Sequence, residues 1–249
     1  MKRMAYMLAV VLFGAAQLHA QQPPAQDLNT LAVTPLPLEP GPLLNPAPEQ
    51  SQWTITSVTV SLASKPANAP VVPTPKSTSS TFTKDGKIYQ VVSIDQNGGK
   101  TVRWSDKRML AAYLPGLDRS IIIHDEGSIY YIDFSKTDYP DFFWITPRNY
   151  VGVAQIGAGK ALVFKGKVRL PTLTAPSIPS LSQDHGESAE VIGLVDLVTR
   201  RPLLLQVDSE QLSYQFAKTS PNLTLPPEVA SAFAFWVKSM QNSMGMPKD

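Results

Sequence analysis

The chain has 249 residues, of which 43% are hydrophobic, 17% are charged and 23 are proline, and it contains no cysteine. This apolar content excludes a wholly disordered chain, and the frequent prolines exclude a long coiled coil. The absence of cysteine excludes disulfides, thiol nucleophiles, Cys-ligated zinc and Cys-ligated iron–sulfur clusters. We therefore expect a globular domain without such a cofactor.

Residues 1–20 have the pattern of a secretory signal peptide. Lys2 and Arg3 supply a positive start, residues 7–16 are apolar, and Ala20 is a small residue at the expected cleavage position. The apolar run is shorter than the roughly 20 residues that a membrane-spanning helix needs. The sequence thus predicts cleavage after Ala20 and a periplasmic or secreted protein that is not integral to the membrane.

The basic balance of the whole chain belongs to this segment. The sequence has 22 Lys and Arg against 20 Asp and Glu, and two of the basic residues are Lys2 and Arg3. The remaining chain is then formally neutral and has no cluster of basic residues. It lacks the electrostatic pattern of proteins that bind nucleic acid or anionic lipid surfaces, so no nucleic-acid partner is expected.

Proline divides the rest of the chain. Residues 21–50 hold eight prolines and almost no charge, which predicts a disordered or polyproline-like tether. Two further proline-rich tracts, 65–80 and 170–186, are predicted to be long loops. Residues 51–243 then form a single globular domain of ordinary size.

Strand patterns dominate that domain. Short apolar or alternating segments follow one another with short turns between them, and Asp85-Gly86 suits the turn of a tight hairpin. Short connections require antiparallel neighbours. The predicted strands, about eleven in number, are 53–62, 81–83, 88–94, 101–105, 121–124, 129–134, 151–156, 161–164, 191–198, 203–207 and 212–216.

Helix signals are few. Asp106 is a possible cap for a short helix reaching residue 114, and a clearer helix begins after Pro226-Pro227. Apolar residues recur on one face of the latter at helical spacing, which predicts that this face covers the sheet. These residues are Val229, Phe233, Trp236, Val237 and Met240. The predicted class is α+β and β-dominated: a curved antiparallel sheet or incomplete barrel with a C-terminal amphipathic helix packed on it.

No catalytic signature is present. His124 and His185 each have carboxylates nearby in sequence and are conceivable general bases, but both fall in predicted turns or loops, where a solvated polar turn is the simpler interpretation. No Gly-x-Ser-x-Gly nucleophile motif occurs. We expect a protein that is not an enzyme, with a hydrolase as the third-ranked hypothesis.

Aromatic residues on or beside the predicted strands suggest a ligand site. A closed core would absorb all of them, whereas a half-open sheet would turn some toward an apolar cavity. The candidates for such a cavity are Trp104, Phe134, Trp144 and Phe164. No metal site is predicted.

The late part of the chain resembles a known family. Residues 189–233 read AEVIGLVDLVTRRPLLLQVDSEQLSYQFAKTSPNLTLPPEVASAF, a strand ending in Asp, a Thr-Arg-Arg-Pro turn, two further strands and Leu-x-Leu-Pro-Pro. With the strand–Gly turn–strand stretch at 144–164, this resembles the LolA/LolB-like superfamily of periplasmic lipoprotein carriers, mainly over residues 144–230. Asp196, Thr199 and Pro202 match the family's Asp-x-x-Thr-x-x-Pro turn.

The resemblance implies an incomplete barrel around an apolar cavity that holds acyl chains. This chain departs from the family pattern because a proline-rich tract stands where the carriers have N-terminal helices, and no residue here matches their cavity-closing arginine. The leading expectation is an exported, non-enzymatic carrier of a lipid or of a lipoprotein acyl chain. The alternative is a structural or interaction module of the envelope with a sealed core, whose partner is another envelope protein.

Overall fold

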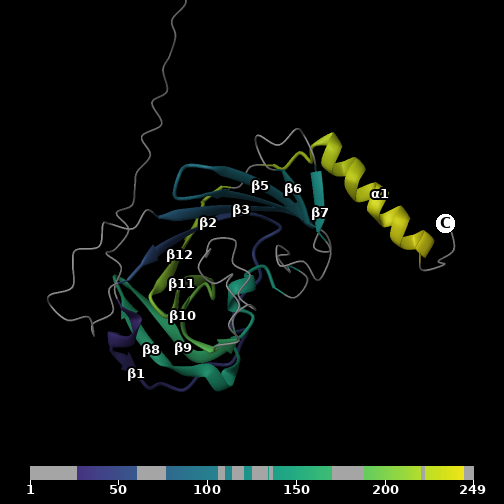
Figure 1. The fold of residues 1–249 in the computed structure, drawn as a ribbon. Coiled ribbons are helices and arrows are strands. Elements are labelled where there is room, and N and C mark those ends of the chain that lie inside the picture. The colour runs from purple at the N-terminus through teal and green to yellow at the C-terminus, as the bar shows by residue number, and fades with distance from the viewer. Residues whose placement is uncertain are drawn as a thin grey trace, which may run out of the picture.

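The computed structural model describes residues 27–60, 77–105, 110–113, 121–124, 134, 137–169, 188–219 and 222–243. Its centre is one antiparallel sheet of twelve strands in the order β1-β8-β9-β10-β11-β12-β2-β3-β4-β5-β6-β7. The sheet curves strongly, and β1 and β7 remain its two edges (Figure 1). The predicted β-dominated, curved and unclosed sheet is therefore confirmed.

The strand bounds follow the predicted pattern closely. Two strands were not predicted, a two-residue β1 in the expected tether and β6, which replaces the short helix expected before residue 114. The strands are β1 (Val33–Thr34), β2 (Gln50–Thr59), β3 (Thr78–Asp85), β4 (Ile88–Ile94), β5 (Lys100–Ser105), β6 (Leu110–Tyr113), β7 (Ile121–His124), β8 (Tyr150–Ile156), β9 (Gly159–Arg169), β10 (Ser188–Asp196), β11 (Pro202–Val207) and β12 (Glu210–Phe216).

Each face of the sheet has its own core. Residues paired across neighbouring antiparallel strands point to the same face, so the register assigns Leu162, Phe164 and Val191 to one side and Ala161 and Val163 to the other. The first set belongs to the large cluster inside the curve, and the second to a smaller cluster outside it. The sheet is therefore buried on both faces along β8–β10.

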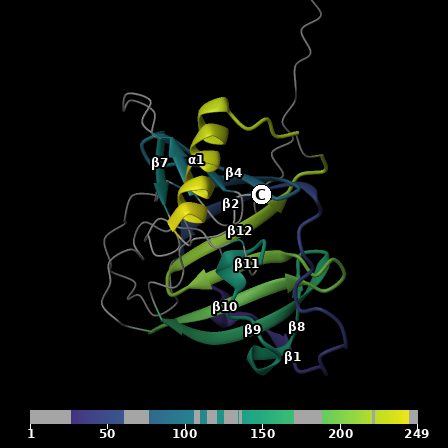
Figure 2. The same ribbon diagram turned by 90° about the vertical axis from the view of Figure 1, so that its right-hand side faces the viewer.

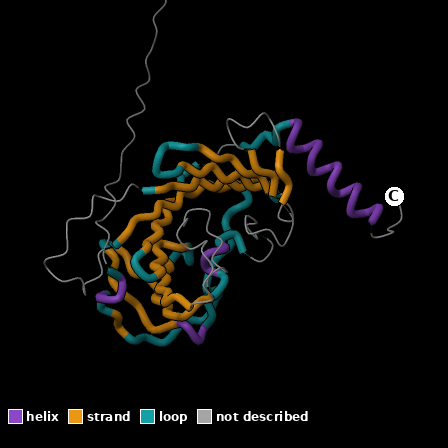
Figure 3. Tube along the Cα trace, in the orientation of Figure 1, coloured by secondary structure: helices purple, strands orange, loops and turns teal. Residues whose placement is uncertain are grey.

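The N-terminal tract differs from the predicted disordered tether. Leu28, in the 3₁₀ turn η1 (Leu28–Thr30), is buried against the convex face, and its backbone N–H donates to Gln206 Oε1 at 2.7 Å. Further along, Ala47 is buried in the concave core. Figure 3 shows η1 outside the curve of the sheet. Prolines keep residues 27–50 out of helices and long strands, but the apolar residues between them still bury surface.

The C-terminal helix α1 (Pro227–Ser243) contacts the sheet through its first turns. Val229 and Phe233 are buried against Trp104 in a separate cluster, whereas Phe235 is 71% exposed. In Figure 1 the helix starts beside the β5–β7 end of the sheet and then projects beyond it, and Figure 2 shows it next to β7. The side chains of Trp236, Val237 and Met240 lie outside the described part of the chain.

Several predictions fall on residues that the structure does not describe. These are the signal peptide at 1–20, the tether at 21–26, most of the loop at 65–80, the strand at 129–134 apart from Phe134, and the loop at 170–186. Within the described ranges, no helix has both the length and the apolar character needed to cross a membrane.

Candidate functional site: the concave face of the sheet

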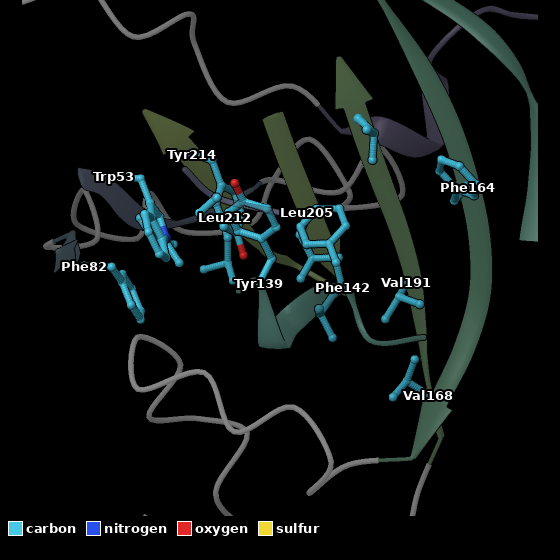
Figure 4. Packing of buried hydrophobic residues seen from close by; sticks show 14 of the residues in the cluster. Trp53, Phe82, Tyr139, Phe142, Phe164, Val168, Val191, Leu205, Leu212 and Tyr214 are labelled. Atoms are coloured by element: carbon cyan, nitrogen blue, oxygen red, sulfur yellow. The ribbon is translucent and has the colours of Figure 1, made fainter. Parts of the chain in front are cut away.

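The concave face of the sheet carries an almost continuous apolar surface. Residues from eight strands, β2 to β4 and β8 to β12, contribute to it, and most are less than 3% exposed. Three large side chains, Trp53, Phe82 and Phe164, project into the curve together with Val191, Leu205 and Leu212 (Figure 4). An open sheet with such a face must be covered, because exposed apolar area of this size is unfavourable in water.

Residues 138–149, here named the cover segment, lie over this face. The segment contains the 3₁₀ turns η2 (Pro140–Phe142) and η3 (Pro147–Asn149), and its described backbone pairs with no strand of the sheet. Tyr139 and Phe142, each 1% exposed, lie among the side chains of the sheet in Figure 4. Among the described residues, the concave core is thus covered by an irregular segment rather than by a helix or a second sheet.

Two glycines of the sheet, Gly166 and Gly193, allow the cover segment to pack closely on it. A Cβ atom at Gly193 would lie 3.1 Å from Phe142 and 3.2 Å from Trp144, and one at Gly166 would lie 3.1 Å from Trp144. Both glycines share the concave side with their neighbours Phe164 and Val191. Because larger residues would push these rings away, the glycines allow the segment to approach the sheet closely.

Aromatic rings connect the segment to the sheet. Trp53 stacks on Phe82 with 5.4 Å between ring centroids, and Tyr139 meets Trp53 edge-on at 5.5 Å. Phe134 stacks on Tyr89 at 4.2 Å. Offset stacks and edge contacts at these distances are favourable arrangements of aromatic rings.

A buried polar network fixes the start of the cover segment. The Asp138 carboxylate accepts hydrogen bonds from the backbone N–H of Ala47 at 2.8 Å and from the hydroxyl of Tyr89, and pairs with Lys84 Nζ at 3.2 Å. Lys84 also donates to the carbonyl of Ala47 at 2.8 Å. Burial and the Asp138 carboxylate raise the pKa of the Tyr89 hydroxyl, which keeps it a donor. The buried charges are therefore paired and hydrogen-bonded, as such charges must be.

A second buried carboxyl group, that of Asp141, has fewer polar partners than that of Asp138 among the described residues. It is 3% exposed, and the hydroxyl of Tyr214 donates to its Oδ2 at 2.7 Å. Burial raises the pKa of Asp141 to about 6, against the lowering effect of the Tyr214 hydrogen bond. Trp144 Nε1 donates to the backbone carbonyl of the same residue at 3.0 Å. The protonation state of Asp141 therefore changes in a mildly acidic range.

The structure separates the four residues predicted to line a cavity. Phe134, Phe164 and Trp144 belong to the concave cluster, the first two buried and Trp144 partly buried. Trp104 lies on the opposite face of β5, under α1, with Val229 and Phe233. Whether the concave residues bind a ligand stays a prediction.

Three further aromatic residues of the concave face, Tyr139, Phe142 and Tyr214, were not among the predicted site residues. Tyr139 was missed because it lies in an irregular segment, whereas Phe142 and Tyr214 were among the aromatic residues noted on or beside the strands but not among the four chosen candidates. The glycines at 166 and 193 were a usable signal, since isolated glycines inside strands often mark the close approach of another part of the chain. The side chain of His124 and all of His185, the two histidines considered as bases, lie outside the described part of the chain.

The arrangement can bind apolar groups and can exchange protons at Asp141. Among the described residues, no cluster of three or more His, Asp or Glu side chains is placed to hold a metal ion. The chemistry available on the concave face is therefore that of apolar contact, with a few buried polar anchors.

No protein-family model matches the chain. No curated protein matches it either. Among solved structures, it is similar to the crystal structure of LprF from Mycobacterium bovis, with 10% sequence identity, 71% of this chain and 89% of that chain covered, and a TM-score of 0.36. We take no residue role from that structure.

Proposed function

We propose that the protein is a non-enzymatic binding protein that holds a lipid, or the acyl chain of a lipoprotein, on the concave face of its sheet. The observation that carries the proposal is the cover of this face. A broad aromatic and aliphatic surface is closed by an irregular segment that pairs with no strand of the sheet in the described part of the chain. A segment held this way opens at lower free-energy cost than a strand of the sheet.

Ligand binding then exchanges one apolar partner for another. Phe142 and Trp144 leave their seats over Gly193 and Gly166, and the acyl chain occupies the surface that they vacate. Each buried methylene contributes about 0.8 kcal/mol, so a chain of about twelve carbons offsets both the opening of the segment and the cost of association.

Export belongs to the same proposal. The signal-peptide pattern at residues 1–20 favours a periplasmic or secreted location, where lipid and lipoprotein acyl chains need a carrier. Partners of this kind require no nucleic-acid contact and no membrane-spanning helix.

Trp emission tests the proposal directly. Titration of the folded protein with dodecanol should give a saturable change in emission, because Trp144 moves when the cover segment opens. Trp144→Phe should remove a large part of that change, whereas the matched Trp104→Phe variant should retain it, since Trp104 lies in the separate cluster under α1. The absence of saturable binding of dodecanol and also of twelve-carbon anionic ligands to a folded sample would overturn the proposal.

A second candidate has its own support. The close fit of Phe142 and Trp144 over the two glycines, and the anchoring of Asp138 to Lys84, are also what a permanently closed core needs. The protein would then be an interaction module of the cell envelope, and its partner another envelope protein. Failure of all acyl ligands to bind would favour this function.

A further inference from the structure

A buried arginine lies at one end of the concave core, in the turn between β10 and β11. Arg200 is 9% exposed, and its Nη1 is a buried donor without a hydrogen-bond partner among the described residues. An arginine has five N–H donors and stays charged at any relevant pH. A buried guanidinium with an unsatisfied donor is costly in a stable fold unless a further group pairs with it.

The backbone holds this arginine in place. Arg200 has a φ of 56°, in the left-handed region that non-glycine residues rarely occupy. Its N–H donates to the carbonyl of Asp196 at 3.0 Å, and its carbonyl accepts from the N–H of Asn45 at 2.9 Å. Such strained positions persist only where the surroundings impose them and are frequent at functional sites. The backbone that carries the guanidinium is therefore held both by its own turn and by the N-terminal tract around Asn45.

A second unsatisfied donor belongs to the same region. The hydroxyl of Tyr150 is buried and has no hydrogen-bond partner in the described chain. Burial raises its pKa, the Arg200 guanidinium lowers it and Glu39 raises it, so all three groups share one electrostatic environment. The tyrosine hydroxyl is accordingly protonated and available to donate.

The existing anionic partner is weak. Glu39 Oε2 lies 3.9 Å from Arg200 Nη2, beyond hydrogen-bond distance, and the Glu39 side chain is 76% exposed. An exposed ion pair of this length contributes little to stability. The carboxylate thus marks the side from which an anion reaches the guanidinium, and is itself easily displaced.

The site is continuous with the apolar concave face. The Tyr150 ring meets Phe164 edge-on with 5.7 Å between centroids, and Leu43, Leu44 and Leu197 pack against the same core. An anionic group at Arg200 therefore has an apolar surface next to it. This is the arrangement that a ligand with a charged head and an apolar chain requires.

We propose that Arg200 Nη1 and the Tyr150 hydroxyl bind the carboxylate or phosphate head group of an acyl ligand that displaces Glu39. This inference rests on the proposed function, because it places the ligand's chain on the concave face. It adds a class of ligand: anionic amphiphiles rather than neutral ones. Charge-assisted hydrogen bonds to such oxygens are stronger than neutral ones, and arginine suits their geometry.

The test compares ligands with the same chain and different heads. Isothermal titration of the folded protein with dodecyl phosphate, dodecanoate and dodecanol should give at least about tenfold tighter binding for the two anions. Inorganic phosphate alone should bind far more weakly than dodecyl phosphate. Phosphate binding as tightly as dodecyl phosphate would overturn the inference, because the site would then take a free anion.

Variants assign the effect to the two residues. Arg200→Gln should weaken dodecyl phosphate binding about tenfold or more and change dodecanol binding less than about twofold. Tyr150→Phe keeps the aromatic ring packed on Phe164. It should weaken the binding of the anionic ligands by a smaller factor than Arg200→Gln does. Lys167→Gln removes an exposed positive charge elsewhere and serves as the control. Thermal melting establishes that each variant is folded.

The outcomes separate this inference from the proposed function. Equal affinity for anionic and neutral ligands, or unchanged dodecyl phosphate binding in both Arg200→Gln and Tyr150→Phe, overturns the anion site alone. Failure of every ligand to bind overturns the inference and the proposed function together. If Arg200→Gln does not fold, the result for Tyr150→Phe decides.

Discussion

Asp141 couples the stability of the fold to pH at the scale of one residue. Burial raises its pKa to about 6 from an ordinary value of 3.8. A folded-state pKa above the unfolded one means that the folded protein holds the proton more tightly. Between pH 6 and 4 the free energy of unfolding should therefore rise as pH falls, by on the order of 3 kcal/mol from this group.

Urea unfolding at several pH values measures this effect. Asp141→Asn keeps an acceptor for Tyr214 and cannot ionise, so its contribution to the pH dependence should disappear. Asp196 is a control of opposite sign. Burial raises its pKa, but hydrogen bonds from Thr199 and Val198 outweigh burial and leave it lowered, so its stabilisation is lost as pH falls. If the free energy of unfolding of Asp141→Asn depends on pH as that of the unmodified protein does, the Asp141 carboxyl is not buried.

Substitution of Gly193 tests whether the cover segment packs closely on the sheet. A methyl group there would meet Phe142 at 3.1 Å, so Gly193→Ala should lower the free energy of unfolding by roughly 1–3 kcal/mol. Gly159→Ala, where the nearest atom would be 3.8 Å away, should cost little. Chemical denaturation compares the two. Equal stabilities would mean that the segment is not held against the sheet as described.

The N-terminal tract is tested at the scale of the element. Leu28 is 2% exposed on the convex face, so Leu28→Ala should destabilise the protein by roughly 2–5 kcal/mol. Leu36, 49% exposed, is the matched control, and its replacement by alanine should have little effect. Denaturant midpoints measure both changes in stability. An unchanged stability of Leu28→Ala would contradict the packing of the N-terminal tract and favour a disordered tether.

The attachment of α1 rests on its first turns. Phe233→Ala should cost about 3 kcal/mol because this ring is 7% exposed against Trp104, whereas Phe235→Ala should be nearly neutral. Thermal melting of the two variants distinguishes a docked helix from a free one. Similar losses in both would mean that the exposed side of the helix is also covered.

At the scale of the whole molecule, strand alternation and turn chemistry predicted the sheet well. Asp85-Gly86 forms the expected hairpin turn with a Gly86 φ of 58°, and the short connections gave antiparallel pairing throughout. Strand propensity depends on local sequence, so β2 to β5 and β7 to β12 were visible from it. Residues 110–113 were misassigned because their pairing with β5 and β7 overrides a helical spacing.

The sequence could not predict which segments pack on each face of the sheet. Prolines in residues 27–50 argue against regular structure, yet packing of Leu28 and Ala47 needs no regular structure. Likewise, alternation alone does not tell which face of β5 is concave, and Trp104 was therefore grouped with Phe134 and Phe164. Long-range register decides which apolar face meets which partner.

The central claim is that the concave face exchanges the cover segment for an apolar chain. Hydrogen–deuterium exchange with and without saturating dodecyl phosphate measures this most directly. We expect faster exchange in residues 138–149 and slower or unchanged exchange in β9 and β10 when the ligand is bound. Unchanged exchange in residues 138–149 at saturation would contradict the claim, because the segment would then remain on the face that the ligand must occupy.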